Sequence, residues 1–152
     1  MENNLSAKCN EPVNLLVTID NNYIEPLIVM MNAYSEAHIG VDTHLFIAHS
    51  SLTECDFKRI RNGIKSAEIT VHNVHITAQW FKGTPVIDRL PEESFYRLMA
   101  FEFLPDTVHR CLYLDPDIII RKSLLPFYGM ELGSFYLAAS SHTYKAKNKF
   151  NL

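Results

Sequence analysis

The sequence predicts an α/β fold in which a mostly parallel sheet is flanked by helices. Short apolar runs rich in β-branched residues alternate with longer segments whose apolar residues recur at helical spacing. Strands that alternate with helices of ordinary length form βαβ units, whose strands run parallel. The 152 residues, 47% of them hydrophobic and 20% charged, are enough for one domain with a substantial core.

Three strands are expected in the first half of the chain. The first (VNLLVTI) is short and continuously apolar, which is typical of a strand buried on both faces. The second (THLFIA) is similar, and the third alternates loosely between apolar and polar residues. These three strands are expected over residues 13–19, 43–48 and 68–76.

Two helices are expected between these strands. The first covers residues 24–37, with Pro26 tolerated in its first turn and Gly40 closing it. The second covers about residues 53–65, because Ser51-Leu52-Thr53-Glu54 matches a capping box. This order of elements supports βαβ units in the first half of the chain.

The second half is expected to continue the same pattern after a loose stretch over residues 76–90. A helix is expected to start at Pro91 and to end before Pro105, with acidic residues in its first turn. A fourth strand is expected at Arg110–Leu114 and a fifth at Phe135–Ala139. Both strands would extend the parallel sheet.

Composition argues against several classes of function. The formal net charge is −3 and there is no basic stripe, so nucleic acid is not an expected partner. The apolar stretches are short and interrupted by charge, so no transmembrane span is expected. The polar N-terminus lacks the apolar core of a secretory signal. We therefore expect a cytoplasmic protein, either free or peripheral at the inner face of the membrane.

Neither the cysteines nor the histidines suggest a zinc site. Cys9, Cys55 and Cys111 are odd in number and widely spaced, which fits reduced thiols better than a disulfide framework. His72 and His75 are close in sequence, but an odd spacing on a strand sends them to opposite faces.

Two polar clusters follow expected strands at their carboxyl ends, where open α/β sheets bind ligands. Asp20-Asn21-Asn22-Tyr23 follows the first strand, and Asp115-Pro116-Asp117 follows the fourth. If the two strands are parallel and close, both clusters open onto the same crevice.

The Asp115-Pro116-Asp117 sequence admits two interpretations. Aspartate and proline at the end of a strand are typical of a turn. Alternatively, Asp115 is held extended because it precedes Pro116, and alternate residues of an extended segment share a face. Asp115 and Asp117 could then bind one Mn²⁺ or Mg²⁺, which prefer oxygen ligands and can bridge to phosphates.

Arg97 and Tyr23 are further candidates for ligand binding. Arg97 lies in a mainly apolar helix, SFYRLMAF, and its guanidinium could clamp a phosphate or pair with Glu93 one turn earlier. Tyr23, beside the polar turn, could stack on a base or simply pack against its neighbours.

Three segments together resemble family-8 glycosyltransferases, retaining enzymes related to bacterial lipopolysaccharide galactosyl- and glucosyltransferases and to glycogenin. In chain order the segments are LVTIDNNYIEPLIVMMNAY, SFYRLMAFEFLP and RCLYLDPDIIIRKSLLPFY. Their shared motifs are a strand-end Asp-x-Asn-Tyr, a helix with Tyr-Arg-Leu and a strand ending in Leu-Asp-x-Asp. The resemblance extends from about Val13 to His142 and implies a Rossmann-like sheet of the GT-A type.

The resemblance implies a UDP-sugar as donor, Mn²⁺ (or Mg²⁺) as cofactor and a saccharide or glycan as acceptor. Arg97 would reach the diphosphate or the sugar of the donor. Asp115 and Asp117 would bind the metal, and Asp115 would also lie close to the ribose and sugar hydroxyls. Ser141 and His142 would fall where contacts to the donor sugar and acceptor begin. The residues that would line the uridine pocket are Thr18, Asp20, Asn22 and Tyr23.

The resemblance also implies that a C-terminal half is missing. Family members continue for a hundred or more residues, with catalytic residues and a His-x-x-Gly-x-x-Lys motif whose histidine completes the metal site. We therefore expect a truncated fold, with an exposed apolar surface that favours self-association. Its parts would be a polar extension (1–12), an incomplete nucleotide-sugar-binding domain (13–142) and a tail (143–152).

Two other functions stay open at this point. The chain could be a donor-binding fragment without activity, or a partner of a separate second half. It could also be a phosphatase of the haloacid-dehalogenase type, in which an apolar strand also leads into Asp-x-Asp. That motif normally ends the first strand and carries Thr or Val where this chain has Ile119.

Overall fold

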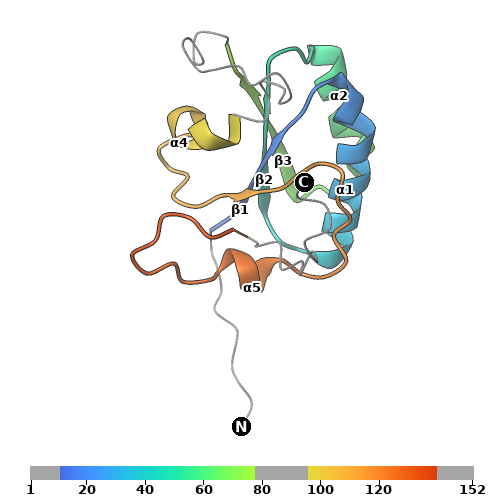
Figure 1. The fold of residues 1–152 in the computed structure, drawn as a ribbon. Coiled ribbons are helices and arrows are strands. Elements are labelled where there is room, and N and C mark those ends of the chain that lie inside the picture. The colour runs from blue at the N-terminus through green and yellow to red at the C-terminus, as the bar shows by residue number, and fades with distance from the viewer. Residues whose placement is uncertain (1–10, 78–95, 140–152) are drawn as a thin grey trace, which may run out of the picture.

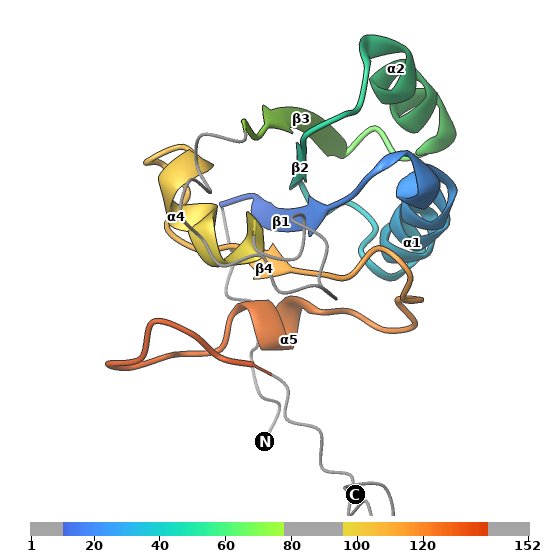
Figure 2. The same ribbon diagram turned by 45° about the horizontal axis from the view of Figure 1, so that its top comes forward.

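The computed structural model describes residues 11–77 and 96–139 of the chain. Its centre (Figure 1) is a four-stranded sheet in the order β3-β2-β1-β4, which Figure 2 labels from top to bottom, and every neighbouring pair of strands is parallel. The strands are β1 (Val13–Thr18), β2 (Thr43–His49), β3 (Ile69–His75) and β4 (Leu112–Tyr113). The expected parallel α/β fold is confirmed.

Helices cover both faces of this sheet. Helices α1 and α2 lie on one face and α4 on the other, which Figure 2 shows most clearly. The α-helices are α1 (Ile24–Ala37), α2 (Glu54–Gly63), α4 (Ala100–Phe103) and α5 (Leu125–Tyr128). Two 3-10 helices, η1 (Asn21–Tyr23) and η3 (Arg97–Met99), lead directly into α1 and α4.

Alternation along β1 creates a separate core on each face. Val13, Leu15 and Val17 face α1 and α2 and are almost completely buried there. Leu16 lies in the opposite core, together with Phe46 and Tyr96. Because side chains two residues apart share a face, Thr18 lies on the same face as Leu16.

The second helix begins with a capping box, but not with the expected one. Thr53 Oγ1 accepts a hydrogen bond from the Asp56 backbone N–H at 3.4 Å, and Asp56 Oδ2 accepts from the Thr53 N–H at 2.8 Å. The expected box over residues 51–54 is therefore wrong, although the helix starts where it was expected. The Leu52 N–H, two residues before the helix, donates to His49 Nδ1 at 2.9 Å and therefore needs no cap. The N–H groups that need a cap are those of the first turn, which starts at Glu54.

His72 and His75 face opposite sides of the sheet, as expected. The His72 ring stacks on Phe46 with 4.6 Å between ring centroids, in the α4-side core. The His75 ring lies 5.4 Å from that of His49, which neighbours Phe57 of α2. Cys55 and Cys111 are free thiols, as expected, whereas Cys9 lies outside the described residues.

The second half of the chain departs further from expectation. The helix expected from Pro91 begins outside the described residues, and its described part is 3-10 helical at η3 before the single turn of α4. The fourth strand is only β4, two residues long instead of five. Helix α5 was not expected, and Pro126 lies in its first turn.

The fifth strand expected at Phe135–Ala139 is wrong. This segment is not a strand and does not pair with the sheet, whose outer member on this side is β4. Its three large side chains are exposed: 75% for Phe135, 102% for Tyr136 and 79% for Leu137. An apolar run forms a strand only where its backbone pairs with a neighbouring strand, and this segment pairs with none among the described residues.

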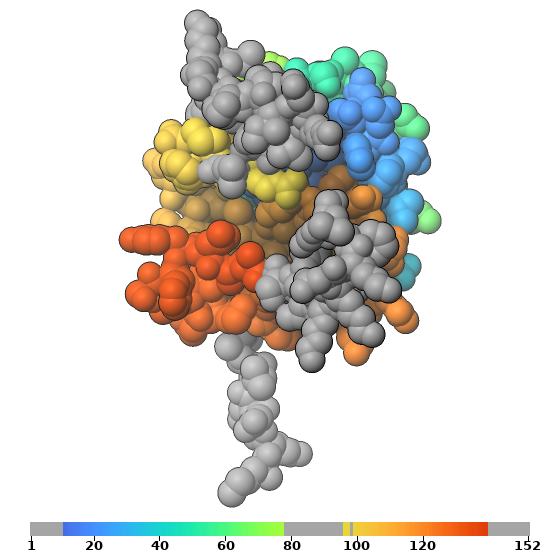
Figure 3. Space-filling view, viewed as in Figure 1, coloured from blue at the N-terminus to red at the C-terminus, as the bar shows by residue number. Residues whose placement is uncertain are grey.

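Large exposed apolar side chains gather on α5 and the segment that follows it. We call this set the C-terminal apolar surface; Figure 3 shows its segment in orange to red at the lower left. Its members are Leu125, Phe127, Met130, Phe135, Tyr136 and Leu137. The expected exposed apolar surface is thus present, and self-association through it stays a prediction. None of the described helices is long and apolar enough to cross a membrane.

Candidate functional site

The carboxyl ends of β1 and β4 lie side by side in the sheet. Leu16 of β1 is in register with Tyr113 of β4, and the Leu114 N–H donates to the Leu16 carbonyl at 3.0 Å. Thr18 lies two residues beyond Leu16, and Asp115 two residues beyond Tyr113, on the face that α4 covers. The two strand ends therefore lie side by side, as expected, with Thr18 and Asp115 at them, whereas a crevice shared by the Asp20–Tyr23 and Asp115–Asp117 clusters stays a prediction.

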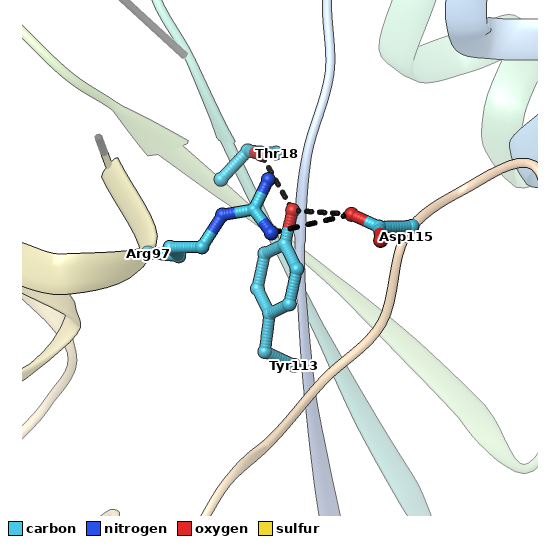
Figure 4. A network of polar contacts seen from close by, with 4 residues as sticks. All are labelled: Thr18, Arg97, Tyr113 and Asp115. Carbon is cyan, nitrogen blue, oxygen red and sulfur yellow. Dashed lines mark hydrogen bonds and ion pairs between the residues drawn. The ribbon is translucent and has the colours of Figure 1, made fainter. Parts of the chain in front are cut away.

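A chain of two hydrogen bonds links Thr18 to Asp115 through Tyr113 (Figure 4). The Tyr113 hydroxyl donates to Asp115 Oδ1 at 3.1 Å and lies 3.1 Å from Thr18 Oγ1. A carboxylate can only accept, so the Tyr113 proton points to Asp115 and the Thr18 hydroxyl donates to Tyr113. Burial is the main cause that raises the pKa of Tyr113, so it remains a neutral phenol.

Arg97 reaches the same group from η3, on the α4 side of the sheet (Figure 4). Its guanidinium carbon lies 4.3 Å from the centre of the Tyr113 ring, a cation–π contact. Its Nη1 lies 3.5 Å from Asp115 Oδ1, with side-chain exposures of 38% for Arg97 and 56% for Asp115. An ion pair this exposed contributes at most about 1 kcal/mol to stability. The alternative pairing with Glu93 lies outside the described residues.

Asp115 keeps one carboxylate oxygen available. Both contacts from Tyr113 and Arg97 end on Oδ1, and no hydrogen bond or ion pair reaches Oδ2 from the described part of the chain. An exposed carboxylate with one uncommitted oxygen is a suitable ligand for Mn²⁺ or Mg²⁺. The donor chemistry therefore fits such an ion, although residues 11–77 and 96–139 contain no group of three or more potential ligands.

The rest of the Asp-x-Asp sequence is a turn, as the simpler interpretation proposed. Pro116 is buried and forms the turn with Asp117, which is exposed. The expected extended alternation of side chains therefore does not continue beyond Asp115. That Asp117 shares a metal ion with Asp115 stays a prediction.

The polar cluster after β1 is organised around its own hydrogen bonds. Asp20 caps η1: its Oδ1 accepts from the Asn22 N–H at 2.8 Å, and its Oδ2 accepts from Asn22 Nδ2 at 3.1 Å. Tyr23 is 41% exposed. These side chains form a polar rim that follows Thr18 in sequence, and no hydrogen bond or ion pair among the described residues joins them to the group around Tyr113. A uridine pocket here stays a prediction, and Ser141 and His142 lie outside the described residues.

The sequence alone pointed to three members of the group, Thr18, Arg97 and Asp115, but not to Tyr113. A signal for Tyr113 was present, because a residue two positions before Asp115 on a strand shares its face. The contact with Arg97 could not be inferred, because it depends on where α4 packs.

Comparison with known proteins gives a consistent result. The sequence model described as Glycosyl transferase family 8 matches residues 14–151. Glycosyltransferase GlyF of Streptococcus pneumoniae serotype 4 (strain ATCC BAA-334 / TIGR4) is 25% identical over 130 residues. Galactosyltransferase LgtC, solved in complex with donor and acceptor sugar analogs, is 25% identical with a TM-score of 0.64. The apo form of glycosyltransferase GlyE from Streptococcus pneumoniae TIGR4 has 18% identity and a TM-score of 0.65, a likeness of fold.

The chain corresponds to only part of each of these proteins. The matched region covers 86% of this chain but 32% of GlyF. The structural match covers 80% of this chain and 44% of LgtC, and 90% of this chain and 31% of GlyE. The chain therefore spans between a third and a half of the length of LgtC, and about a third of GlyF and GlyE.

Proposed function

The chain belongs to glycosyl transferase family 8, and from this membership we propose that it binds the nucleotide-sugar donor of a hexosyl transfer. The donor is a UDP-sugar, and the acceptor of the complete reaction is a saccharide or glycan. The reaction retains the configuration of the sugar and depends on Mn²⁺ or Mg²⁺.

One observation carries the proposal: Thr18, Arg97 and Asp115 are joined through Tyr113 at the carboxyl edge of the sheet. Ligands of open α/β sheets bind at this edge. A guanidinium beside a carboxylate with a free oxygen offers a cation for a diphosphate and an anionic ligand for a divalent ion.

Each residue then has a distinct task. Arg97 binds the diphosphate, whose negative charge grows as the bond to the sugar breaks. Asp115 and Asp117 hold the divalent ion, which when bound neutralises charge on the leaving diphosphate. Thr18, Asp20 and Asn22 offer polar contacts to the uridine.

Two further features support the nucleotide end of the site. Tyr23, 41% exposed beside the Asp20–Asn22 pair, offers a ring on which a base can stack. LgtC, to which the chain is similar, was solved with donor and acceptor sugar analogs, which supports sugar ligands for this fold.

The experiment is a calorimetric titration of the protein with UDP in the presence and absence of Mn²⁺. We expect binding that strengthens with Mn²⁺ and is lost in the double variant Asp115→Ala, Asp117→Ala. A matched control is Asp106→Ala, an exposed aspartate in the loop after α4, which should bind like the wild type. Folded wild-type protein that binds no UDP, or a double variant that binds equally well, would contradict the proposal.

A second candidate is donor binding without transfer by these 152 residues. The observation that favours it is the partial coverage of the relatives, between 31% and 44% of their lengths. A protein that binds UDP-hexose but releases no UDP from it, with or without added saccharide, would support this candidate. Measurable UDP release that Arg97→Ala abolishes would support transfer. The phosphatase alternative is not taken further, because the chain belongs to a glycosyltransferase family.

A further inference from the structure

We propose that Tyr113 is a positioning residue of this donor site. Its hydroxyl holds Asp115 and its ring holds Arg97, so that both charged groups are in place before a nucleoside diphosphate arrives. The inference rests on the proposed function and assigns a role to a residue that contacts neither the ion nor the donor in the proposal.

The hydroxyl acts on Asp115. It donates at 3.1 Å to Oδ1, and it is itself fixed because the Thr18 hydroxyl donates to it at 3.1 Å. With Oδ1 engaged in this way, the carboxylate is held with Oδ2 uncommitted. A hydrogen bond to a charged acceptor is stronger than one between neutral groups. The bond from Tyr113 therefore restrains the Asp115 carboxylate, which can rotate once that bond is lost.

The ring acts on Arg97. The guanidinium lies 4.3 Å from the ring centre, while its ion pair with Asp115 is exposed and 3.5 Å long. The ion pair is therefore readily exchanged, whereas the ring can stay beneath the guanidinium during the exchange. Arg97 can turn from Asp115 to a phosphate while it remains on Tyr113, and Asp115 then keeps its bond to the hydroxyl.

Tyr113 is suited to this task because a rigid element holds it. It belongs to β4, in register with Leu16, and its ring packs against the core on the α4 side of the sheet. A group on a strand is held more precisely than one on a loop. Arg97 and Asp115, by contrast, lie on a 3-10 helix and beyond the end of a strand.

The test uses two substitutions that separate hydroxyl from ring. Tyr113→Phe keeps the ring beneath Arg97 and removes the hydroxyl, whereas Tyr113→Leu removes both. The matched control is Tyr128→Phe in α5, whose hydroxyl donates to the Arg110 carbonyl at 3.1 Å and accepts from the Asn14 N–H at 3.2 Å. Binding of UDP with Mn²⁺ is measured by calorimetry, and thermal unfolding is measured in parallel.

We expect Tyr113→Phe to weaken Mn²⁺-dependent UDP binding about tenfold, the loss of one hydrogen bond to a charged group. Tyr113→Leu should weaken it further. Tyr128→Phe should lower the unfolding temperature without changing UDP binding. A merely structural role for Tyr113 would instead make the two phenylalanine variants behave alike.

Double-variant cycles measure how strongly Arg97 and Thr18 are coupled to Tyr113 in UDP binding. This second readout does not rest on Tyr113→Leu alone. Arg97→Ala should cost about the same factor in affinity in the wild type and in Tyr113→Phe, but much less in Tyr113→Leu. Thr18→Val should weaken binding in the wild type and weaken it by a smaller factor in Tyr113→Phe, because the Tyr113 hydroxyl that it supports is gone and only its own contact to the uridine remains to be lost.

The outcomes separate this inference from the function on which it rests. Wild-type protein that binds no UDP overturns the proposed function and the inference together. Wild-type protein that binds UDP, with Tyr113→Phe binding equally well and every double variant strictly additive, overturns the inference alone. A tenfold loss in Tyr113→Phe with intact folding and coupling to Thr18 supports both.

Discussion

The chain up to the end of β3 buries the apolar residues of its strands, whereas the chain from β4 onward buries some, such as Ile120 and Tyr128, and exposes others. In the first region, side chains such as Leu15, Val17 and Leu45 are completely buried. In the second, Phe135, Tyr136 and Leu137 are 75% or more exposed, although their sequence is equally apolar. Apolar composition alone therefore does not bury a segment.

The reason for the difference is pairing. β1 pairs with β2 along its whole length, from Val13 with Thr43 to Thr18 with Ala48. β4 pairs with β1 only through Leu112 and Tyr113. The segment Phe135–Ala139 pairs with no strand among the described residues, so it contributes little to the stability of the sheet.

The largest difference in stability between the two regions is expected from a pair of leucine-to-alanine substitutions. Leu15→Ala, at a side chain with 0% exposure, should lower the free energy of unfolding by about 2–5 kcal/mol, because it leaves a cavity. Leu137→Ala, at 79% exposure, should change it by less than about 0.5 kcal/mol. Urea unfolding followed by circular dichroism measures both. Equal losses would mean that the segment after β4 is packed in solution.

A smaller effect is expected from the helix cap in the first region. Thr53→Ala removes the side chain that accepts from the Asp56 N–H and should cost about 1 kcal/mol. Ser51→Ala, in the box that the sequence suggested, should cost less than about 0.5 kcal/mol. The same urea titration measures the pair, and a larger loss in Ser51→Ala would contradict the cap seen in the structure.

The first region should also lose stability in mild acid. Burial lowers the pKa of His49 and of His72, whose Nε2 is buried and has no hydrogen-bond partner in the part of the chain that the structure describes. Below the ordinary histidine pKa of about 6.5, the unfolded chain binds protons that the folded chain does not, so the free energy of unfolding falls as pH drops. Above about pH 7.5 this contribution should be constant, because both states are then neutral at these residues.

Unfolding free energies measured between pH 5.5 and 8 test this expectation. The double variant His49→Gln, His72→Gln should show a flatter dependence below about pH 6.5, because it lacks the two linked groups. An unchanged slope in the double variant would assign the acid sensitivity to other groups.

Substitutions at the C-terminal apolar surface should have the smallest effect on the free energy of unfolding. They should nevertheless reduce self-association. A triple variant, Phe135→Ser, Tyr136→Ser and Leu137→Ser, should unfold at the same urea concentration as the wild type but self-associate less. Size-exclusion chromatography and binding of a hydrophobic dye measure the difference. A wild-type protein that elutes as a monomer and binds no dye would contradict self-association.

The sequence determined more of the first region than of the second. β1, α1, β2 and β3 lie where apolar patterning placed them, α2 starts where a capping signal placed it, and α1 agrees with expectation at both ends. In the second region the fourth strand is shorter than expected, the fifth is absent at Phe135–Ala139 and α5 was missed. In the first region, locally strong periodicity was sufficient to place the helices and strands. In the second region, whether a strand forms depends on a neighbouring strand to pair with, which the local sequence does not reveal.

The candidate site divides in the same way. The sequence by itself determined that Asp20 and Asp115 follow strands of a parallel sheet, since strand ends can be read from apolar runs and polar turns. Only the tertiary structure decided that β4 lies beside β1, that η3 brings Arg97 over the ring of Tyr113, and that Pro116 and Asp117 form a turn. Local propensity fixes where an element begins and ends, but the packing of elements distant in sequence fixes which side chains meet.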